Sequence, residues 1–217
     1  MPSYIKTLIN EGEHQQLDFK FGVNDSKKIA RTLAAFANTD GGRLLLGVKD
    51  NGAIAGVRSD EEYYMMEAAA QLYCKPPVNF DMHEWEENGK NVLEIIVSKS
   101  EQIHYAPDKD GVYKVFVRVD DQNYMANGVL LKVWKKKKNK VGVKIKFTDT
   151  ERSLIKHIEE YGRISLNGFK KLSGLSLKRC EYILADFIVL DIIKLNYSET
   201  GVYYTLNPDF SKTNSDL

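Results

Sequence analysis

Residues 34–52 have the sequence AAFANTDGGRLLLGVKDNG, and this stretch decides how the first half of the chain folds. Apolar residues recur at helical spacing just before this stretch and at its start: Ile29, Leu33, Phe36 and Ala37. A strand-like apolar run follows at residues 44–48 and ends at the turn-forming sequence Asp50-Asn51-Gly52. Because a helical period passes into a strand within so few residues, the sequence predicts that helices and strands are interleaved here.

The rest of the first half continues this mixture of elements. A helix is expected over residues 61–73, and it stops before Pro76-Pro77 because proline disfavours the helical conformation of the preceding residue. Strands are expected at residues 80–85, 92–97 and 112–119. Residues 1–131 are therefore expected to form an α+β domain in which a mixed sheet carries helices.

The second half begins with a specific helix-start signal. Thr148 can cap a helix while Glu151, three residues later, completes a capping box. A second helix is expected over residues 165–174, and a third begins behind Ser176. Two alternating runs within residues 193–206 then predict a hairpin.

This order of elements, over residues 147–210, resembles the winged helix-turn-helix family. In that family the third helix lies in the major groove of DNA, and the hairpin, called the wing, touches the backbone. Winged helices also serve as protein-interaction units, so the resemblance alone leaves that alternative open. Residues 211–217 are expected to form a tail.

Charge is distributed unevenly along the chain. Residues 1–131 carry 14 basic and 20 acidic side chains, a net charge of −6, whereas residues 132–217 carry 17 and 10, a net charge of +7. Residues 132–146 hold eight lysines and no acid. We interpret them as a lysine-rich connector that meets a polyanion, although a charge run is also typical of any solvated surface. Apolar residues at helical spacing predict that its first part is a helix docked on the first domain.

The expected nucleic-acid contacts lie in these basic segments. They comprise the side chains opposite the apolar stripe of the third helix, two lysines of the second helix and four lysines of the connector. The full set is Lys135, Lys136, Lys137, Lys138, Lys170, Lys171, Ser176, Lys178, Arg179 and Tyr182. Glu181 and Asp186, on the same third helix, weaken a surface that would face phosphates.

Three motifs of the first domain carry a more specific resemblance. They are the sequence EHQQLDFK at residues 13–20, the stretch 34–52, and Phe116-Val117-Arg118. The spacing of Asn-Thr-x-Gly-Gly and then Gly-Val-x-Asp resembles the Schlafen AlbA-2 family over about residues 1–131. The resemblance implies a bacterial DNA-binding domain or transcriptional regulator, often with a winged helix behind it.

The same resemblance implies an alternative function, because some relatives are ribonucleases with three catalytic carboxylates. Matched by motif, these carboxylates fall on Glu13, Asp18 and Asp50, with Lys20 beside them. Such a group would hold Mg²⁺ or Mn²⁺, and the lysine would stabilise charge at a scissile phosphate. Asp18 departs from the glutamate usual in the family, and Asp120 replaces a frequent glycine. Each acid also has a structural explanation: Asp50 suits its turn, Glu13 would be an exposed loop acid, and Asp18 would pair with Lys20 or Arg43.

We therefore expect a cytoplasmic DNA-binding regulator rather than an enzyme, with a metal-dependent ribonuclease as the alternative. DNA is the expected partner in preference to RNA. A homodimer is also expected, because such regulators commonly contact two half-sites. No cofactor is expected beyond the metal of a nuclease. The sequence holds no run of apolar residues long enough to predict a membrane span.

Overall fold

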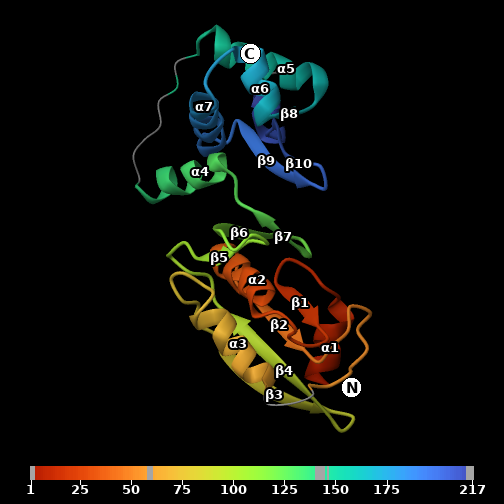
Figure 1. Ribbon diagram of the computed structural model, residues 1–217. Coiled ribbons are helices and arrows are strands. Elements are labelled where there is room, and N and C mark those ends of the chain that lie inside the picture. Colours follow the sequence, from red (N-terminus) through yellow and green to blue (C-terminus); the bar gives the residue numbers. More distant parts are fainter. Residues whose placement is uncertain (1–2, 58–60, 140–144, 146, 214–217) are drawn as a thin grey trace. The chain divides into compact units, whose positions relative to one another are not determined.

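The structure is a computed structural model that describes residues 3–57, 61–139, 145 and 147–213. The chain divides into two units, Met1–Ala126 and Asn127–Leu217 (Figure 1). Each unit is described by itself below. None of the helices in the described part of the chain has the length and apolar character that crossing a membrane requires.

The first unit is a mixed α+β domain with two sheets. A four-stranded sheet has the order β1-β2-β4-β3, in which β1 pairs with β2 in parallel and the other pairs are antiparallel. A three-stranded sheet has the order β5-β6-β7. The strands are β1 (Leu17–Lys20), β2 (Gly42–Leu46), β3 (Asp81–Glu87), β4 (Lys90–Val97), β5 (Tyr105–Pro107), β6 (Tyr113–Val119) and β7 (Gln122–Met125). The helices are α1 (Tyr4–Glu11), α2 (Ser26–Asn38) and α3 (Glu61–Gln71). The expected mixture of helices and strands is confirmed.

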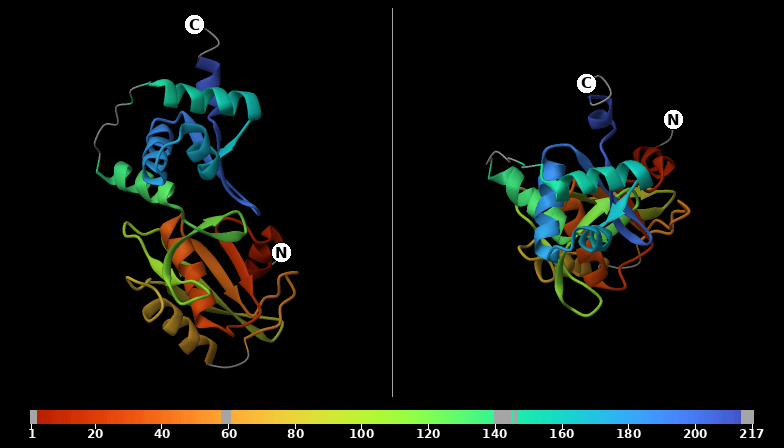
Figure 2. Two further views of the ribbon diagram at one scale, coloured as in Figure 1. Left: turned by 45° about the horizontal axis from the view of Figure 1, so that its top comes forward. Right: turned by 90° about the horizontal axis from the view of Figure 1, so that it is seen from above.

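The four-stranded sheet is covered by helices on both faces. Leu44 and Leu46 of β2 belong to one apolar cluster with α2 and α3, whereas Leu45 belongs to a second cluster with α1. This alternation is the two-residue period of a strand buried on both faces. Figure 2 shows α1 and α2 on opposite sides of the strands.

Helix α2 lies between the two sheets, and this position explains its composition. It contacts β4 of the large sheet and all three strands of the small sheet. Eight of its residues are buried, four of them alanines. Small side chains let the backbones of helix and strands approach closely, so the alanine-rich sequence fits a helix that is surrounded by protein.

The Asn38-Thr39 pair ties the end of α2 to the small sheet. Asn38 Nδ2 donates to the carbonyls of His104 and Phe116 at 2.8 and 2.9 Å, and Asn38 Oδ1 accepts from the amide of His104 at 2.8 Å. Thr39 Oγ1 accepts from the amide of Arg118 at 3.0 Å. The two side chains therefore supply hydrogen bonds to backbone groups that would otherwise lack a partner.

Gly41 and Gly42 serve the turn between α2 and β2. Gly41 has φ +73°, and a Cβ atom there would lie 2.8 Å from the carbonyl oxygen of Val97. A Cβ at Gly42 would lie 2.5 Å from the ring of Phe36. Both positions require glycine for space, and Gly41 also requires it for its backbone conformation.

The second unit consists of helices around a small antiparallel sheet of order β8-β10-β9. Its elements are α4 (Gly128–Lys138), α5 (Asp149–Tyr161), β8 (Ile164–Ser165), α6 (Leu166–Ser173), α7 (Leu177–Val189), β9 (Ile193–Ser198), β10 (Gly201–Leu206) and α8 (Pro208–Thr213). Its core holds Leu154, Phe169, Leu184 and Phe187.

Local signals placed the helix ends of this unit correctly. The Thr148 capping box is present, with the Glu151 carboxylate accepting from the Thr148 amide at 3.0 Å. Ser165 and Ser176 cap α6 and α7. Gly162 ends α5 in the left-handed conformation.

The expectation that the first part of the lysine-rich connector docks on the first domain is wrong. Helix α4 packs against α7, and its Val129 and Val133 are buried in the core of the second unit. The unit boundary accordingly lies at residue 126 rather than 131. Residues 140–144 and 146 of the connector lie outside the described residues, as do residues 214–217 of the expected tail, into which α8 extends.

We predict that Asn38→Ala destabilises the first unit by about 2–4 kcal/mol, since three hydrogen bonds of about 1 kcal/mol each are lost and their backbone partners stay desolvated. The measurement is urea unfolding in a Trp134→Phe background, where Trp85 of β3 reports on the first unit alone. Asn91→Ala is the matched control, because Asn91 is exposed and hydrogen-bonds only at the surface through its side chain to Glu84. Equal effects of the two substitutions would contradict the prediction.

Candidate functional site

Strand β1 carries two of the predicted site residues on one face. Leu17 and Phe19 pack in the apolar cluster with α1. Asp18 and Lys20, which alternate with them, project from the other face, where they line a pocket with α2 and β6. The strand period therefore brings a carboxylate and an ammonium to the same cavity.

Glu13 joins this pair from the segment before β1. Lys20 Nζ lies 2.9 Å from Asp18 Oδ1 and 3.7 Å from Glu13 Oε1. Glu13 Oε1 also accepts from the backbone amide of Phe19 at 2.8 Å. Three of the four predicted catalytic residues, Glu13, Asp18 and Lys20, are thus brought together.

Arg118 of β6, a strand of the small sheet, completes the cluster. Its side chain is 2% exposed, and its Nη2 donates to the carbonyls of His14 and Leu17 at 3.3 and 3.2 Å. The same nitrogen lies 3.6 Å from Asp18 Oδ1. Nη1 donates to Asn123 Oδ1 at 3.4 Å. A buried guanidinium with this many acceptors fixes the position of the Asp18 carboxylate.

The two carboxyl groups have opposite pKa shifts. Burial, followed by the hydrogen bond to Asp18, raises the pKa of Glu13 to about 7. Burial would also raise the pKa of Asp18, but the hydrogen bond with Glu13 and the charges of Lys20 and Arg118 outweigh it and lower that pKa. The pair therefore retains a proton below about pH 7, and the opposite shifts favour Glu13 as its carrier.

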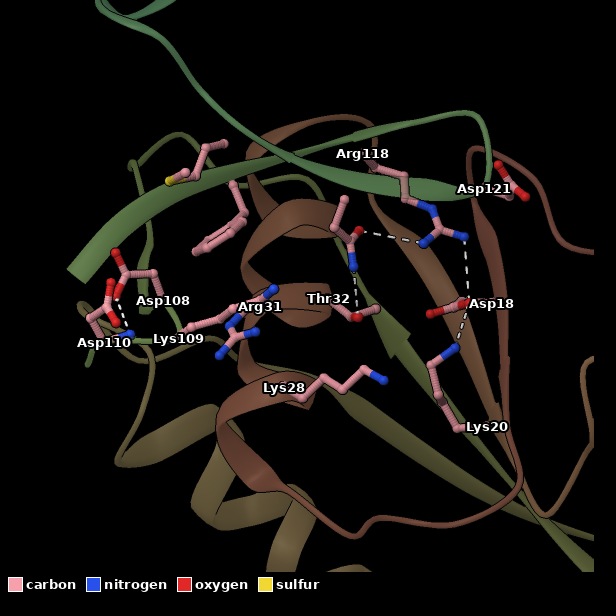
Figure 3. A pocket seen from close by; sticks show the side chains of 13 residues that line it. Asp18, Lys20, Lys28, Arg31, Thr32, Asp108, Lys109, Asp110, Arg118 and Asp121 are labelled. Atoms are coloured by element: carbon pink, nitrogen blue, oxygen red, sulfur yellow. Dashed lines mark hydrogen bonds and ion pairs between the residues drawn. The ribbon is translucent and has the colours of Figure 1, made fainter. Parts of the chain in front are cut away.

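The pocket beside this cluster has a volume of about 590 Å³ and lies entirely within the first unit (Figure 3). Its basic lining residues are Lys20, Lys28, Arg31, Lys109 and Arg118. Its acidic lining residues are Asp18, Asp108, Asp110 and Asp121. Because both charges are present, the pocket suits a polar ligand with several hydrogen-bonding groups rather than a simple anion.

The sequence patterns did not point to Lys28 and Arg31. They stand three residues apart on α2, and Arg31 Nε donates to the carbonyl of Pro107 at 2.7 Å. Residues at this spacing share a helix face, so the sequence could have indicated a basic face on α2. That this face lines a pocket depends on the small sheet, whose position beside α2 no local pattern reveals.

Asp50 does not join Glu13 and Asp18. It is exposed in the turn after Val48, where Gly52 donates its amide to the carbonyl of Lys49 at 2.7 Å. Among the residues that the structure describes, no three His, Cys, Asp or Glu side chains are grouped so that they could hold a metal ion. The three predicted carboxylates are therefore not grouped in the structure, and the Mg²⁺ or Mn²⁺ site stays a prediction.

The predicted contacts of the second unit fall into two groups. Ser176, Lys178 and Arg179 are exposed in the first turn of α7, and Lys170 and Lys171 are exposed on α6. The Ser176 hydroxyl also caps α7 by accepting from the Arg179 amide. These five side chains lie at the surface as expected.

The lysines of α4 are not equivalent. Lys135, Lys137 and Lys138 are exposed, but Lys136 Nζ lies 2.8 Å from Asp186 Oδ1. Tyr182 lies beneath the ammonium groups of both Lys136 and Lys132. Lys136 and Tyr182 are therefore occupied within the unit, which their sequence positions did not indicate.

Comparison with known proteins gives a family match for the first unit. The family model described as Schlafen, AlbA_2 matches residues 13–127. A search of the curated proteins finds no match. The crystal structure of the DIP2311 protein from Corynebacterium diphtheriae is 19% identical with a TM-score of 0.45, covering 61% of this chain and 27% of that one. The N-terminal domain of a RecG-related protein from Nitrosomonas europaea is 23% identical with a TM-score of 0.41, covering 55% and 89%.

We predict that Glu13 makes the first unit less stable as the pH rises from 5 to 8. Because its pKa is raised from 4.5 to about 7 on folding, the stabilising proton is held at low pH and lost as the pH passes 7. The lowered pKa of Asp18 acts below its ordinary value of 3.8, outside this window. Urea midpoints of the first unit should fall between pH 5 and 8, and Glu13→Gln should flatten the decline. Glu86→Gln, on the exposed side of β3, should leave the slope unchanged.

Proposed function

This chain belongs to the Schlafen AlbA_2 family, and on that basis we propose that it is a DNA-binding protein of the transcriptional-regulator type. In this proposal the second unit is a winged helix-turn-helix, with α7 as the recognition helix and the β9–β10 hairpin as the wing. The family match covers the first unit, whereas the proposed DNA contacts lie in the second.

The order and connection of the elements support the proposal. Helices α5, α6 and α7 are followed by the β9–β10 hairpin, and β8 pairs with β10. Residues 174–176 connect α6 to α7, with Gly174 in the left-handed conformation and Ser176 as the cap. A tight turn that contains glycine, between the second and third helices, is typical of helix-turn-helix modules.

The observation that carries the proposal is the exposure of the first turn of α7. Ser176, Lys178 and Arg179 face solvent there, whereas the opposite side of the helix is buried in the core. In this fold the N-terminal residues of the third helix reach the base edges. Lys170 and Lys171 are exposed on the preceding helix and can pair with phosphates.

We predict that Lys178→Ala combined with Arg179→Ala weakens binding of duplex DNA by roughly tenfold or more at low salt, because two cations leave the contact surface. Fluorescence anisotropy of a labelled duplex at two salt concentrations gives both the affinity and the salt slope, which should also decrease. The control is Arg152→Ala with Lys156→Ala, two exposed cations of α5. If the wild-type protein does not bind duplex DNA at low salt, the proposed function is wrong.

A second function, ribonuclease, has one observation in its favour. Glu13 and Asp18 form a carboxyl pair whose pKa values move in opposite directions, beside Lys20 and an open pocket. Pairs of this kind occur where one acid donates a proton during catalysis. Glu13 would supply that proton and Lys20 would stabilise charge on a phosphate oxygen. The proposed roles of Glu13 and Lys20 involve no metal, since the three carboxylates are not grouped in the structure.

We predict that, if the protein cleaves RNA, Glu13→Gln abolishes cleavage and Asp50→Ala does not, because only Glu13 belongs to the cluster. The assay incubates tRNA and single-stranded DNA with the protein in Mn²⁺ and, separately, in a chelator. Loss of cleavage in Asp50→Ala would instead support the three-carboxylate site. An absence of cleavage in every condition would exclude this second function.

A further inference from the structure

Helix α4 covers the side of α7 that faces away from the core. Cys180, Leu184 and Phe187 point into the core of the second unit. Ala185 lies about 140° around the helix from Cys180 and is nevertheless fully buried. Figure 1 shows α4 beside α7, and the two helices are in close contact. Part of the outer face of α7 is therefore covered by α4.

Two ion pairs hold the helices together. Lys132 Nζ lies 2.6 Å from Glu181 Oε2, and Lys136 Nζ lies 2.8 Å from Asp186 Oδ1. All four side chains are less than 30% exposed. The Tyr182 ring centroid lies 5.2 and 5.7 Å from the two ammonium groups. The lysines of α4 thus occupy the acidic and aromatic side chains that α7 presents outward.

Apolar packing and a close backbone approach anchor α4 further. Val129 and Val133 are buried in the core cluster of the second unit. A Cβ atom at Gly128 would collide with the Glu181 carboxylate, so glycine permits the contact. Asn127, which caps α4, donates from Nδ2 to the hydroxyl of Tyr204 at 3.0 Å. These contacts define one specific packing position for α4 on this unit.

We propose that α4 is an intramolecular cover over the outer face of α7, closed by the two lysine–carboxylate pairs, and that duplex DNA binds more tightly when the cover opens. This inference depends on the proposed function, in which α7 is the recognition helix. In the closed state the first turn of α7 is exposed. Helix α4 covers the outer face of the next two turns, which the wall of the DNA major groove would otherwise contact. Binding then has to include the cost of opening α4.

The apparent affinity of such a protein is its intrinsic affinity reduced by the fraction of molecules that are open. A change that opens the cover without altering the net charge should therefore raise the affinity. Simple attraction between a basic protein and DNA predicts no change for the same variant, because its charge is unaltered. The two explanations differ in a measurable way.

The test is the charge-neutral variant Lys132→Gln, Lys136→Gln, Glu181→Gln, Asp186→Asn, which removes both pairs. We expect it to bind a labelled duplex roughly tenfold more tightly than the wild-type chain. Val133→Ala, which loosens α4 without touching a charge, should shift the affinity in the same direction. The matched control is Asp149→Asn with Arg152→Gln, a charge-neutral removal of the exposed pair on α5, and it should leave the affinity unchanged.

Opening of the cover is measured independently of DNA. In a Trp85→Phe background, Trp134 of α4 is the only tryptophan, and its emission should shift to the red in the charge-neutral variant as the half-buried indole enters water. A red shift without tighter binding, or no red shift and unchanged affinity, overturns the cover while DNA binding by the wild type stands. If neither the wild type nor any variant binds, the proposed function itself fails, and the cover fails with it.

Discussion

The first unit depends on a single buried cation. The Arg118 guanidinium has almost no contact with solvent, so its charge and its N–H groups must be met inside the protein. The carbonyls of His14 and Leu17 accept from Nη2, and the carboxylate of Asp18 lies 3.6 Å from the same nitrogen; these three residues belong to β1 and the segment before it, while Nε has no hydrogen-bond partner among the described residues. The small sheet is thereby tied to the edge of the large one. The Asn38-Thr39 motif makes the second tie, from the end of α2 to the same small sheet, and Arg118 and Asp18 of the first tie line the pocket.

This arrangement also explains why the described carboxylates of the first unit are not grouped as a metal site requires. A divalent cation needs several oxygen ligands whose negative charge is not already neutralised. Lys20 and Arg118 both lie close to Asp18 Oδ1, and Glu13 keeps a proton up to about pH 7. With Asp50 in a separate exposed turn, the cluster has no surplus of negative charge. Its carboxyl groups pair with Lys20, Arg118 and the Phe19 amide, and acid–base chemistry is what the pair can offer.

Local signals in the sequence were sufficient for much of the fold. The change of period between α2 and β2, the capping box at Thr148 and the glycine after α5 each act over a few residues, and each prediction from them is confirmed. The pairing of Lys136 with Asp186 could not be predicted in this way, because the partners are 50 residues apart and the lysine lies in a run that is typical of solvated surface. From the sequence, Glu181 and Asp186 indicate only acids that weaken a phosphate-facing surface. Their pairing with Lys132 and Lys136 depends on the packing of α4 against α7.

The position of α4 changes what the uneven charge of the chain means. A net charge of +7 after residue 131 suggests a broadly basic surface, but a lysine that is paired with a carboxylate on a neighbouring helix adds little to the field outside the protein. Lys132 and Lys136 are paired in this way, whereas Lys178 and Arg179 are exposed in a single helical turn. Among the described residues, the first turn of α7, α6 and the outer side of α4 carry exposed cations that a phosphate backbone can reach. Nucleic-acid contact by this chain is therefore a question of which lysines are free, and net charge alone does not answer it.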